Sequence, residues 1–144
     1  ITPLHVKILC EKLKQIFEYV IIDAPAGLDD GLAVAIGGAD EVIMVITPEY
    51  SSLRDCETVT MALKEYGICN VHYVLNKVNT KLMSAGLAPS LKDFPRNITD
   101  RMIGLVQQDE NIHISTNMGV PIVFMKETYI SKNFDNIAKR MEKL

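Results

Sequence analysis

Tyr19-Val-Ile-Ile-Asp-Ala-Pro-Ala-Gly27 is the stretch on which the prediction of the fold rests. Its apolar residues do not alternate with polar ones, and most of them are β-branched, which is typical of a parallel strand covered on both faces. Pro25 cannot donate to a strand ladder, so the strand must stop before it. The stretch therefore predicts a buried strand over residues 18–23 that ends at a carboxylate.

Asp23 is the first candidate for a functional residue. In open α/β sheets, ligands bind at the carboxyl ends of the strands. An aspartate at that place commonly holds Mg²⁺ beside nucleotide phosphates. Gly27 allows the backbone to approach a phosphate and offer its N–H. The alternative is a buried strand whose aspartate only caps the following turn.

Composition restricts the classes of protein to be considered. The chain has 144 residues, of which 48% are hydrophobic and 23% charged, as in one ordinary globular domain. It contains neither a signal-peptide pattern nor an apolar run of the roughly 20 residues that a membrane span needs. The cytoplasm is therefore the expected location. The net charge of -3 makes nucleic acid an unlikely partner, because phosphate backbones favour clustered Lys and Arg.

The three cysteines and three histidines give no metal-site pattern. The cysteines form no Cys-x-x-Cys pair and are odd in number, so neither a disulfide framework nor a zinc or iron–sulfur site is predicted. The histidines are far apart in the sequence and have no ligand spacing. Structural or surface roles are expected for both residue types.

Helices are predicted from caps and apolar periodicity. Thr2-Pro3 has the form of a helix start, and Asp29 and Asp30 stand at the start of a short helix that ends at Gly37-Gly38. Apolar stripes are expected to face the core. They comprise Val6, Leu9, Cys10, Leu13, Ile16 and Phe17 in the first helix; Leu53, Cys56, Val59, Leu63 and Tyr66 in a helix opened by Ser52 and Asp55 as a capping box; and Phe134, Ile137, Ala138 and Met141 in a last helix capped by Ser131.

Further strands alternate with these helices. They are expected at residues 42–47, 71–75 and 103–106, with a final edge strand at 121–124 because proline is tolerated at a strand start. Asp109 is expected to cap a helix that ends near Gly119. In residues 79–99, glycine and prolines break any long helix. The alternation predicts an α/β fold, in one domain over residues 1–144, with a mostly parallel sheet flanked by helices.

Several separated motifs follow one another along the chain. They are Asp23-Ala-Pro-Ala-Gly27, Ala39-Asp-Glu41 before Val42-Ile-Met-Val-Ile-Thr-Pro-Glu49, Ser51-Ser-Leu-Arg-Asp55, Leu75-Asn-Lys-Val78 and Ser115-Thr-Asn-Met-Gly-Val-Pro121. Their order resembles that seen in MinD-like ATPases. The chain resembles the C-terminal portion of that family, which belongs to the deviant Walker A group of P-loop ATPases. A P-loop needs a glycine-lysine pair, which this sequence lacks, so the P-loop is expected before Ile1 in a longer protein.

The resemblance implies roles for particular residues. Asp23 would organise Mg²⁺ and the attacking water, and Gly27 would contact the γ-phosphate of ATP. Asn76 resembles the family's adenine-reading asparagine, although a turn-forming Asn is the alternative. Val106, Gln107, Gln108 and Asp109 would hold the base, with Gln107 standing where relatives carry a proline.

The resemblance also implies partners and a biological role. The longer protein would bind ATP and Mg²⁺, dimerise, and help to place the division site, with peripheral association at the inner membrane through a segment not present here. Arg54, Asp55 and Glu57 match a region associated with the dimer interface and with division-regulator proteins, although a solvated helix face is the alternative. Two other interpretations stay open: a related ATPase with another cargo, such as a partition, flagellar-number or iron–sulfur protein, and a non-enzymatic interaction domain without a P-loop.

Overall fold

The computed structural model describes residues 1–125 and 128–144, and it divides into two compact units. The first unit comprises residues 1–42 and 57–71, and the second comprises residues 43–56 and 72–144. Helix α3 (Tyr50–Glu65) begins in the second unit and ends in the first.

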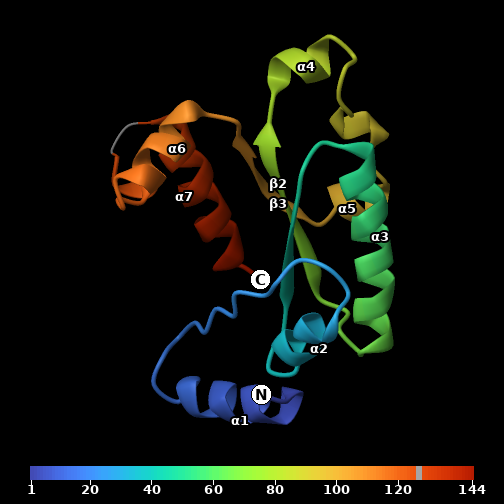
Figure 1. Cartoon of the computed structure of the whole chain (residues 1–144), viewed down its shortest axis with the longest axis vertical. Helices are drawn as coiled ribbons and strands as arrows, with labels where there is room; N and C mark the ends of the chain where they lie inside the picture. The colour runs from blue at the N-terminus through green and yellow to red at the C-terminus, as the bar shows by residue number, and fades with distance from the viewer. Residues whose placement is uncertain (126–127) are drawn as a thin grey trace. The chain divides into compact units, whose positions relative to one another are not determined.

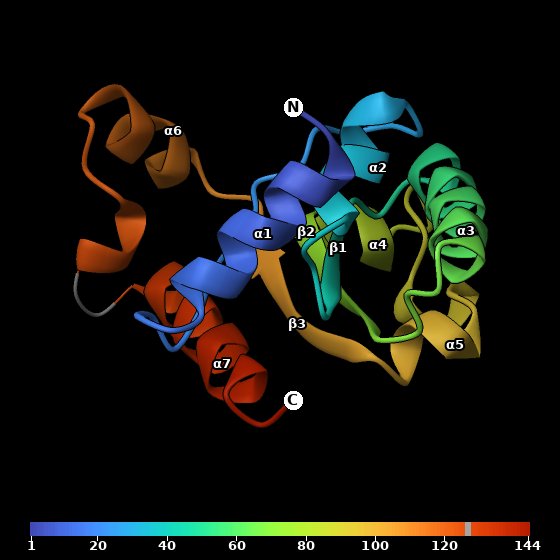
Figure 2. The same cartoon turned by 90° about the horizontal axis from the view of Figure 1, so that it is seen from below.

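A three-stranded parallel sheet organises the second unit. Its strands are β1 (Val42–Ile46), β2 (Val71–Val78) and β3 (Met102–Gln107), arranged in the order β1-β2-β3. In two perpendicular views the strands lie between α7 (Tyr129–Met141) on one side and α5 (Arg96–Thr99) on the other (Figures 1 and 2). The predicted α/β class, with a parallel sheet flanked by helices, is confirmed.

The core of the second unit forms where α7 packs on β3. Its buried members are Val74, Ile103, Val106, Ile122, Ile130 and Ile137. Gly104 of β3 permits the close contact, because a Cβ placed on it would lie 2.3 Å from Cγ1 of Ile137. Arg140 adds a polar contact by donating from its guanidinium to the carbonyl of Ile103 at 2.8 Å.

Short helical segments complete the second unit. The predicted break-up of residues 79–99 is confirmed, because this region contains only α4 (Thr80–Ser84), the 3₁₀ helix η1 (Leu91–Asp93) and α5. Helix α6 (Glu110–Asn117) follows β3 and is capped by Asp109, as predicted. The 3₁₀ helix η2 (Ile122–Phe124) lies between α6 and α7.

The first unit is built on α1 (Pro3–Leu13) and α2 (Asp30–Ile36). Thr2 caps α1 and Asp29 caps α2, as their positions in the sequence predict. The two helices contact each other, and an ion pair between Lys14 and Asp40 links the segments that follow them.

The predicted buried strand over residues 18–23 is wrong. These residues are irregular, and Ile21 is 84% exposed. Within the described ranges, residues 18–28 make no backbone–backbone hydrogen bonds. A strand requires a neighbour to complete its ladder, and an apolar run alone does not supply one.

The predicted edge strand over residues 121–124 is also wrong. Pro121 has φ -56° and is followed by η2, with Ile122 buried and Phe124 71% exposed. Burial of Ile122, and not hydrogen bonding to a neighbouring strand, holds this segment in place. Proline at a strand start is tolerated, but it does not by itself choose the strand over a helical turn.

Two predicted helix starts are displaced. Helix α3 begins at Tyr50, so Ser52 lies inside it, where its Oγ accepts from the Thr47 N–H at 3.1 Å. Helix α7 is capped by Thr128, whose Oγ1 accepts from the Ser131 N–H at 3.1 Å. Several hydroxyl residues near each start can cap, and the packing of the neighbouring apolar residues decides between them.

The predicted apolar stripes are only partly buried. Cys10, Leu53, Cys56, Leu63 and Ile137 are buried as expected. The exposed residues of those stripes are Leu9, Ile16, Phe17, Tyr66, Phe134 and Ala138. Ile16, Phe17 and Tyr66 lie beyond the last residues of their helices, so the helical period no longer places them.

Candidate functional site

A cavity of about 570 Å³ lies at the carboxyl ends of the strands. It is entirely within the second unit, where β2 points toward α4 (Figure 1). The lining residues are Pro48, Glu49, Tyr50, Ser51, Lys77, Asn79, Leu82, Leu87, Ala88, Pro89 and Gln108. This is the place in an α/β sheet where ligands bind, and it combines apolar walls with a few polar groups.

The end of β2 is bulged beside this cavity. The pairing of β2 with β3 shifts between Leu75 and Val78, and Lys77 has φ +55°, a conformation that non-glycine residues adopt rarely. Its N–H donates to Oδ1 of Asn76 at 2.9 Å. The bulge thus leaves Lys77 exposed at the cavity and uses one of the two polar atoms of the Asn76 amide.

Two side-chain amides meet in the wall of the cavity. Asn79 caps α4 by accepting from the N–H groups of Lys81 and Leu82, both at 3.2 Å. Its Nδ2 donates to Oε1 of Gln108 at 3.5 Å. The N–H of Gln108 also donates to the Val78 carbonyl at 2.9 Å, so the residue that follows β3 is held on β2 at its backbone.

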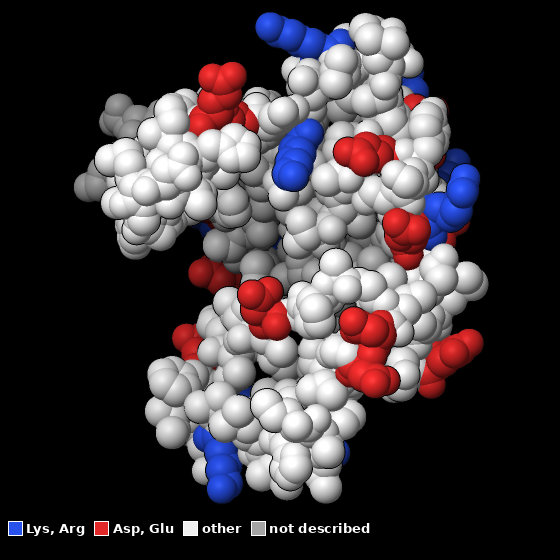
Figure 3. All heavy atoms as spheres, in the orientation of Figure 1, with Lys and Arg blue, Asp and Glu red and all other residues white. Residues whose placement is uncertain are grey.

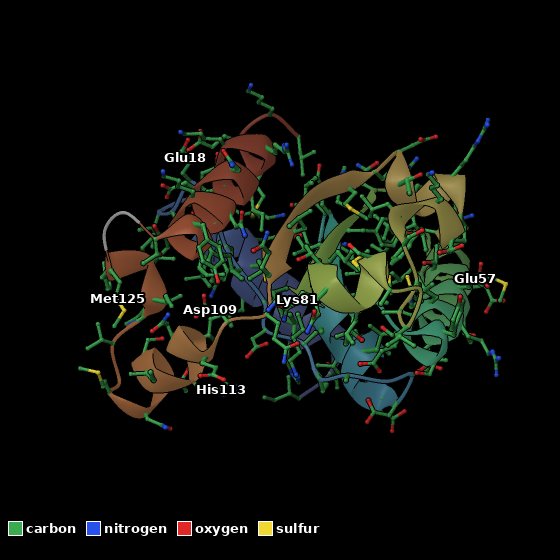
Figure 4. All side chains as sticks on the ribbon, turned by 90° about the horizontal axis from the view of Figure 1, so that it is seen from above. Glu18, Glu57, Lys81, Asp109, His113 and Met125 are labelled. Carbon is green, nitrogen blue, oxygen red and sulfur yellow. The ribbon has the colours of Figure 1, made fainter. Side chains whose placement is uncertain are left out.

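Asp109 links this wall to α6 and α7. Its Oδ1 accepts from the Asn111 N–H at 2.7 Å, and its Oδ2 accepts from the hydroxyl of Tyr129. The Tyr129 hydroxyl, helped by the Asn111 N–H, holds the pKa of Asp109 below its usual value, and the carboxylate raises the pKa of Tyr129. In Figure 4, Asp109 lies where α6 begins, with His113 further along the same helix.

The structure places the predicted base-site residues along the ends of β2 and β3. Gln108 lines the cavity. Val106 is buried in the core, so only its backbone can face a ligand. Gln107 ends β3 and pairs with Val78. Within the described residues, the Nδ2 group of Asn76 has no hydrogen-bond partner and remains able to donate.

The predicted phosphate and metal residues lie in the first unit. Asp23 is exposed, and within residues 1–125 and 128–144 its carboxylate has no hydrogen bond or ion pair. Gly27 has φ +104°, which favours glycine, and its Cα faces open space. Carboxylate oxygens are ligands that Mg²⁺ prefers, and a backbone N–H can bind a phosphate, so the roles assigned to Asp23 and Gly27 stay predictions.

Sequence reasoning missed three residues of this region. Asn79 follows a strand and precedes a helix, a pattern that predicts a cap but gives no sign of its contact with Gln108. Lys77 lies at the cavity because of a bulge that no local pattern marks. Tyr129 is 20 residues from Asp109, and only the packing of α7 brings the two together.

The surface carries mixed charge. On the face shown in Figure 3, Asp and Glu side chains are interspersed with Lys and Arg side chains. Of the helices in the described ranges, none has the length and apolar character required to cross a bilayer.

Comparison with known proteins shows what the chain is similar to. No protein-family model matches it. The septum site-determining protein MinD of Bacillus subtilis is 33% identical over 98% of this chain and 53% of its own length. The corresponding protein of Synechocystis is 35% identical over 93% of this chain and 51% of its own length. The chain therefore spans about half the length of these relatives.

Solved structures agree with this similarity. The MinD cell division protein of Aquifex aeolicus superimposes with a TM-score of 0.93 and 25% identity, over 100% of this chain and 62% of its own. The MinD protein of Pyrococcus horikoshii, solved with Mg-ADP, superimposes with a TM-score of 0.75 and 28% identity, over 98% of this chain and 57% of its own. A MinC:MinD complex of Aquifex aeolicus gives a TM-score of 0.87 and 24% identity, over 96% of this chain and 60% of its own. At that identity the likeness shows the fold alone.

By fold and sequence, the chain is similar to proteins of the MinD and ParA type of P-loop ATPase. Within that class, it resembles a portion of a MinD-like protein.

Proposed function

We propose that this chain is part of a MinD-like ATPase that acts in septum site determination through ATP-dependent dimerisation and membrane association. The observation that carries the proposal is the cavity at the carboxyl ends of β1, β2 and β3, in a chain that matches septum site-determining proteins over nearly its whole length. Position and size suit a nucleobase, and amide groups that can both donate and accept lie in or beside its wall.

In this proposal each of the assigned residues has its own role toward the nucleotide. Asp23 holds Mg²⁺, and the Gly27 N–H contacts the γ-phosphate. Asn76 and residues 106–109 hold the base, with Lys77 and Asn79 of the cavity beside them. When bound, Mg²⁺ neutralises charge that develops on the transferred phosphoryl group. The phosphate cradle itself belongs to a P-loop supplied by the rest of the protein.

The proposed partners follow from the relatives. A homodimer, a division regulator and the membrane surface are the expected partners of the full-length protein. The MinD protein of Aquifex aeolicus was itself solved in a complex with MinC. Peripheral association at the inner membrane, from the cytoplasm, is the corresponding location.

The test uses the full-length protein and its Asp23→Ala variant. We expect the parent to bind ATP·Mg²⁺ and hydrolyse it, and the variant to keep its fold while turnover falls at least about a hundredfold, because the metal ligand is lost. Circular dichroism checks the fold, and phosphate release measures turnover. Near-normal turnover in the variant would remove Asp23 from the site. Absence of ATP binding by the folded parent would reject the proposed activity.

The cellular part of the proposal has a separate test. Depletion of the full-length protein in its own cells should produce division septa at abnormal positions, visible by membrane staining. Re-expression of the parent should restore normal placement, and re-expression of the Asp23→Ala variant should not. Normal septum placement after complete depletion would contradict a role in site determination.

A further inference from the structure

The turn between β3 and α6 is held from three sides. Gln108 is fixed to β2 by the hydrogen bond from its N–H to the Val78 carbonyl at 2.9 Å. The next residue, Asp109, caps α6 through its Oδ1. The remaining carboxylate oxygen accepts from the hydroxyl of Tyr129, which is the first residue of α7.

Tyr129 is a firm anchor because the start of α7 is fixed in the core. The neighbouring Ile130 is 1% exposed, and Ile137, further along the same helix, packs against Gly104 of β3. Thr128 caps the helix just before Tyr129. Tyr129 itself is 50% exposed, so its packing contributes less than the position of its hydroxyl.

We propose that Tyr129 is a positioning residue for base selection: by holding Asp109, it sets the orientation of the turn that carries Gln108 into the cavity wall. This inference rests on the proposed nucleotide function of that cavity. Tyr129 does not line the cavity, and it acts through Asp109 and Gln108. The pKa of Asp109 is lowered by this hydroxyl, so the acceptor is a charged carboxylate at neutral pH and the hydrogen bond is charge-assisted.

The chemical consequence concerns selectivity more than phosphate binding. The Gln108 amide can present a donor or an acceptor to a base edge, and which of the two it presents depends on how its backbone and its contact with Asn79 orient it. A turn held in one orientation distinguishes an adenine edge from a guanine edge. A turn released from Tyr129 samples several orientations and distinguishes them less well.

The test compares ATP and GTP affinities by calorimetry in the full-length protein. Tyr129→Phe removes only the hydroxyl. Asp109→Ser keeps a residue that caps helices but is too short to reach Tyr129. Each variant is expected to weaken ATP binding by about threefold to tenfold, as the loss of one hydrogen bond does, and to reduce the ratio of ATP to GTP affinity. Tyr66→Phe, which removes the hydroxyl of an exposed residue directly after α3, serves as the matched control and should change neither quantity.

The double variant supplies the readout that a merely structural role would not give. If both residues act through their shared hydrogen bond, the double variant should bind ATP no more weakly than the weaker-binding single variant. The inference would be overturned if the two losses of ATP affinity multiplied in the double variant, or if Tyr129→Phe left the ratio of ATP to GTP affinity unchanged. A variant with Gln108→Ala separates the two levels of the argument. Loss of selectivity there, with none in Tyr129→Phe, rejects only the positioning role, whereas unchanged binding in Gln108→Ala rejects the base site itself.

Discussion

Gly104 shows how one residue without a side chain decides the packing of a helix. A Cβ at this position would lie 2.3 Å from Cγ1 of Ile137, well inside contact distance. Because Gly104 and Ile137 are both buried, Ile137 cannot turn toward solvent to make room for a methyl group at residue 104. The requirement is steric and not conformational, since Gly104 is not among the glycines with positive φ.

We therefore expect Gly104→Ala to destabilise the protein by about 1–3 kcal/mol through overpacking. Urea unfolding followed by circular dichroism measures the change. Ile137→Ala removes the opposing atoms and should destabilise by about 2–5 kcal/mol on its own. Combined with Gly104→Ala it should cost less than the sum of the two single changes. Additive costs would show that these two residues do not limit the approach of α7.

A second local device is the cap of η1. Ser90 donates from its N–H and its hydroxyl to one oxygen of Asp93, at 2.7 and 2.8 Å. The hydroxyl first, and the N–H second, hold the pKa of Asp93 below its ordinary value. Because the folded-state pKa is lowered, the stability that this contact contributes is present above about pH 3.8 and is lost as the pH falls through the lowered pKa.

Ser90→Ala should move the pKa of Asp93 upward, toward its ordinary value. NMR of the Asp93 carboxyl carbon resonance, over about pH 2 to 6, reports this pKa directly. Ser84→Ala removes a hydroxyl that donates to the Thr80 carbonyl, and it is the control that should leave Asp93 unchanged. A pKa that stays in place after Ser90→Ala would show that the hydroxyl does not determine it.

At the scale of elements, the helix starts separate what local sequence decides from what packing decides. Thr2, Asp29 and Asp109 cap the helices that their positions predict, because each is a residue that caps helices well and stands directly before the helix. Before α7, Thr128 and Ser131 are both suitable. The structure uses Thr128 because burial of Ile130 makes that residue part of the helix.

The cap of α7 can be tested by a pair of variants. Thr128→Ala should destabilise the protein by about 1 kcal/mol, because the Ser131 N–H loses its acceptor. Thr128→Ser keeps the hydroxyl and should stay within a few tenths of a kcal/mol of the parent. Thermal unfolding of both variants gives the comparison. Equal losses would indicate that the methyl group, and not the cap, is responsible.

Strands were predictable where a neighbour exists and unpredictable where none does. Val42–Ile46, Val71–Val78 and Met102–Gln107 form adjacent strands close to their predicted positions. Tyr19 to Ile22 has the same β-branched composition but no ladder. Composition reports the preference of a segment, whereas the partner that realises the preference is a property of the tertiary structure.

The same distinction holds for the candidate site. Asp23, Gly27 and Asn76 were predicted from a local pattern, a strand-like run followed by a polar residue or a glycine, and from the family resemblance. Asn79 and Tyr129 were not found, because their contacts with Gln108 and Asp109 span 29 and 20 residues of sequence. Local patterns identify ligand groups, but the contacts that orient those groups arise only when distant elements pack.

At the scale of the whole molecule, binding of a nucleoside triphosphate depends on how many groups the chain offers to balance the charge of the phosphates. The cavity offers amides for a base, and Asp23 and Gly27 offer one carboxylate and one N–H. A nucleoside triphosphate needs several backbone N–H groups and a lysine around its β- and γ-phosphates. The sequence contains no glycine-lysine pair of that kind.

We therefore expect the 144-residue chain alone neither to hydrolyse ATP nor to bind it tightly, because the groups that balance the triphosphate charge are missing. Calorimetry with ATP·Mg²⁺ should give a dissociation constant of about 1 mM or weaker, whereas the full-length protein should bind at least tenfold tighter, a difference of more than about 1.4 kcal/mol. Adenosine separates the contributions of base and phosphate. If the cavity holds the base, adenosine should bind the chain and the full-length protein about equally, since it does not use the phosphate cradle. Micromolar binding of ATP by the isolated chain would show that the triphosphate is held by residues within this sequence.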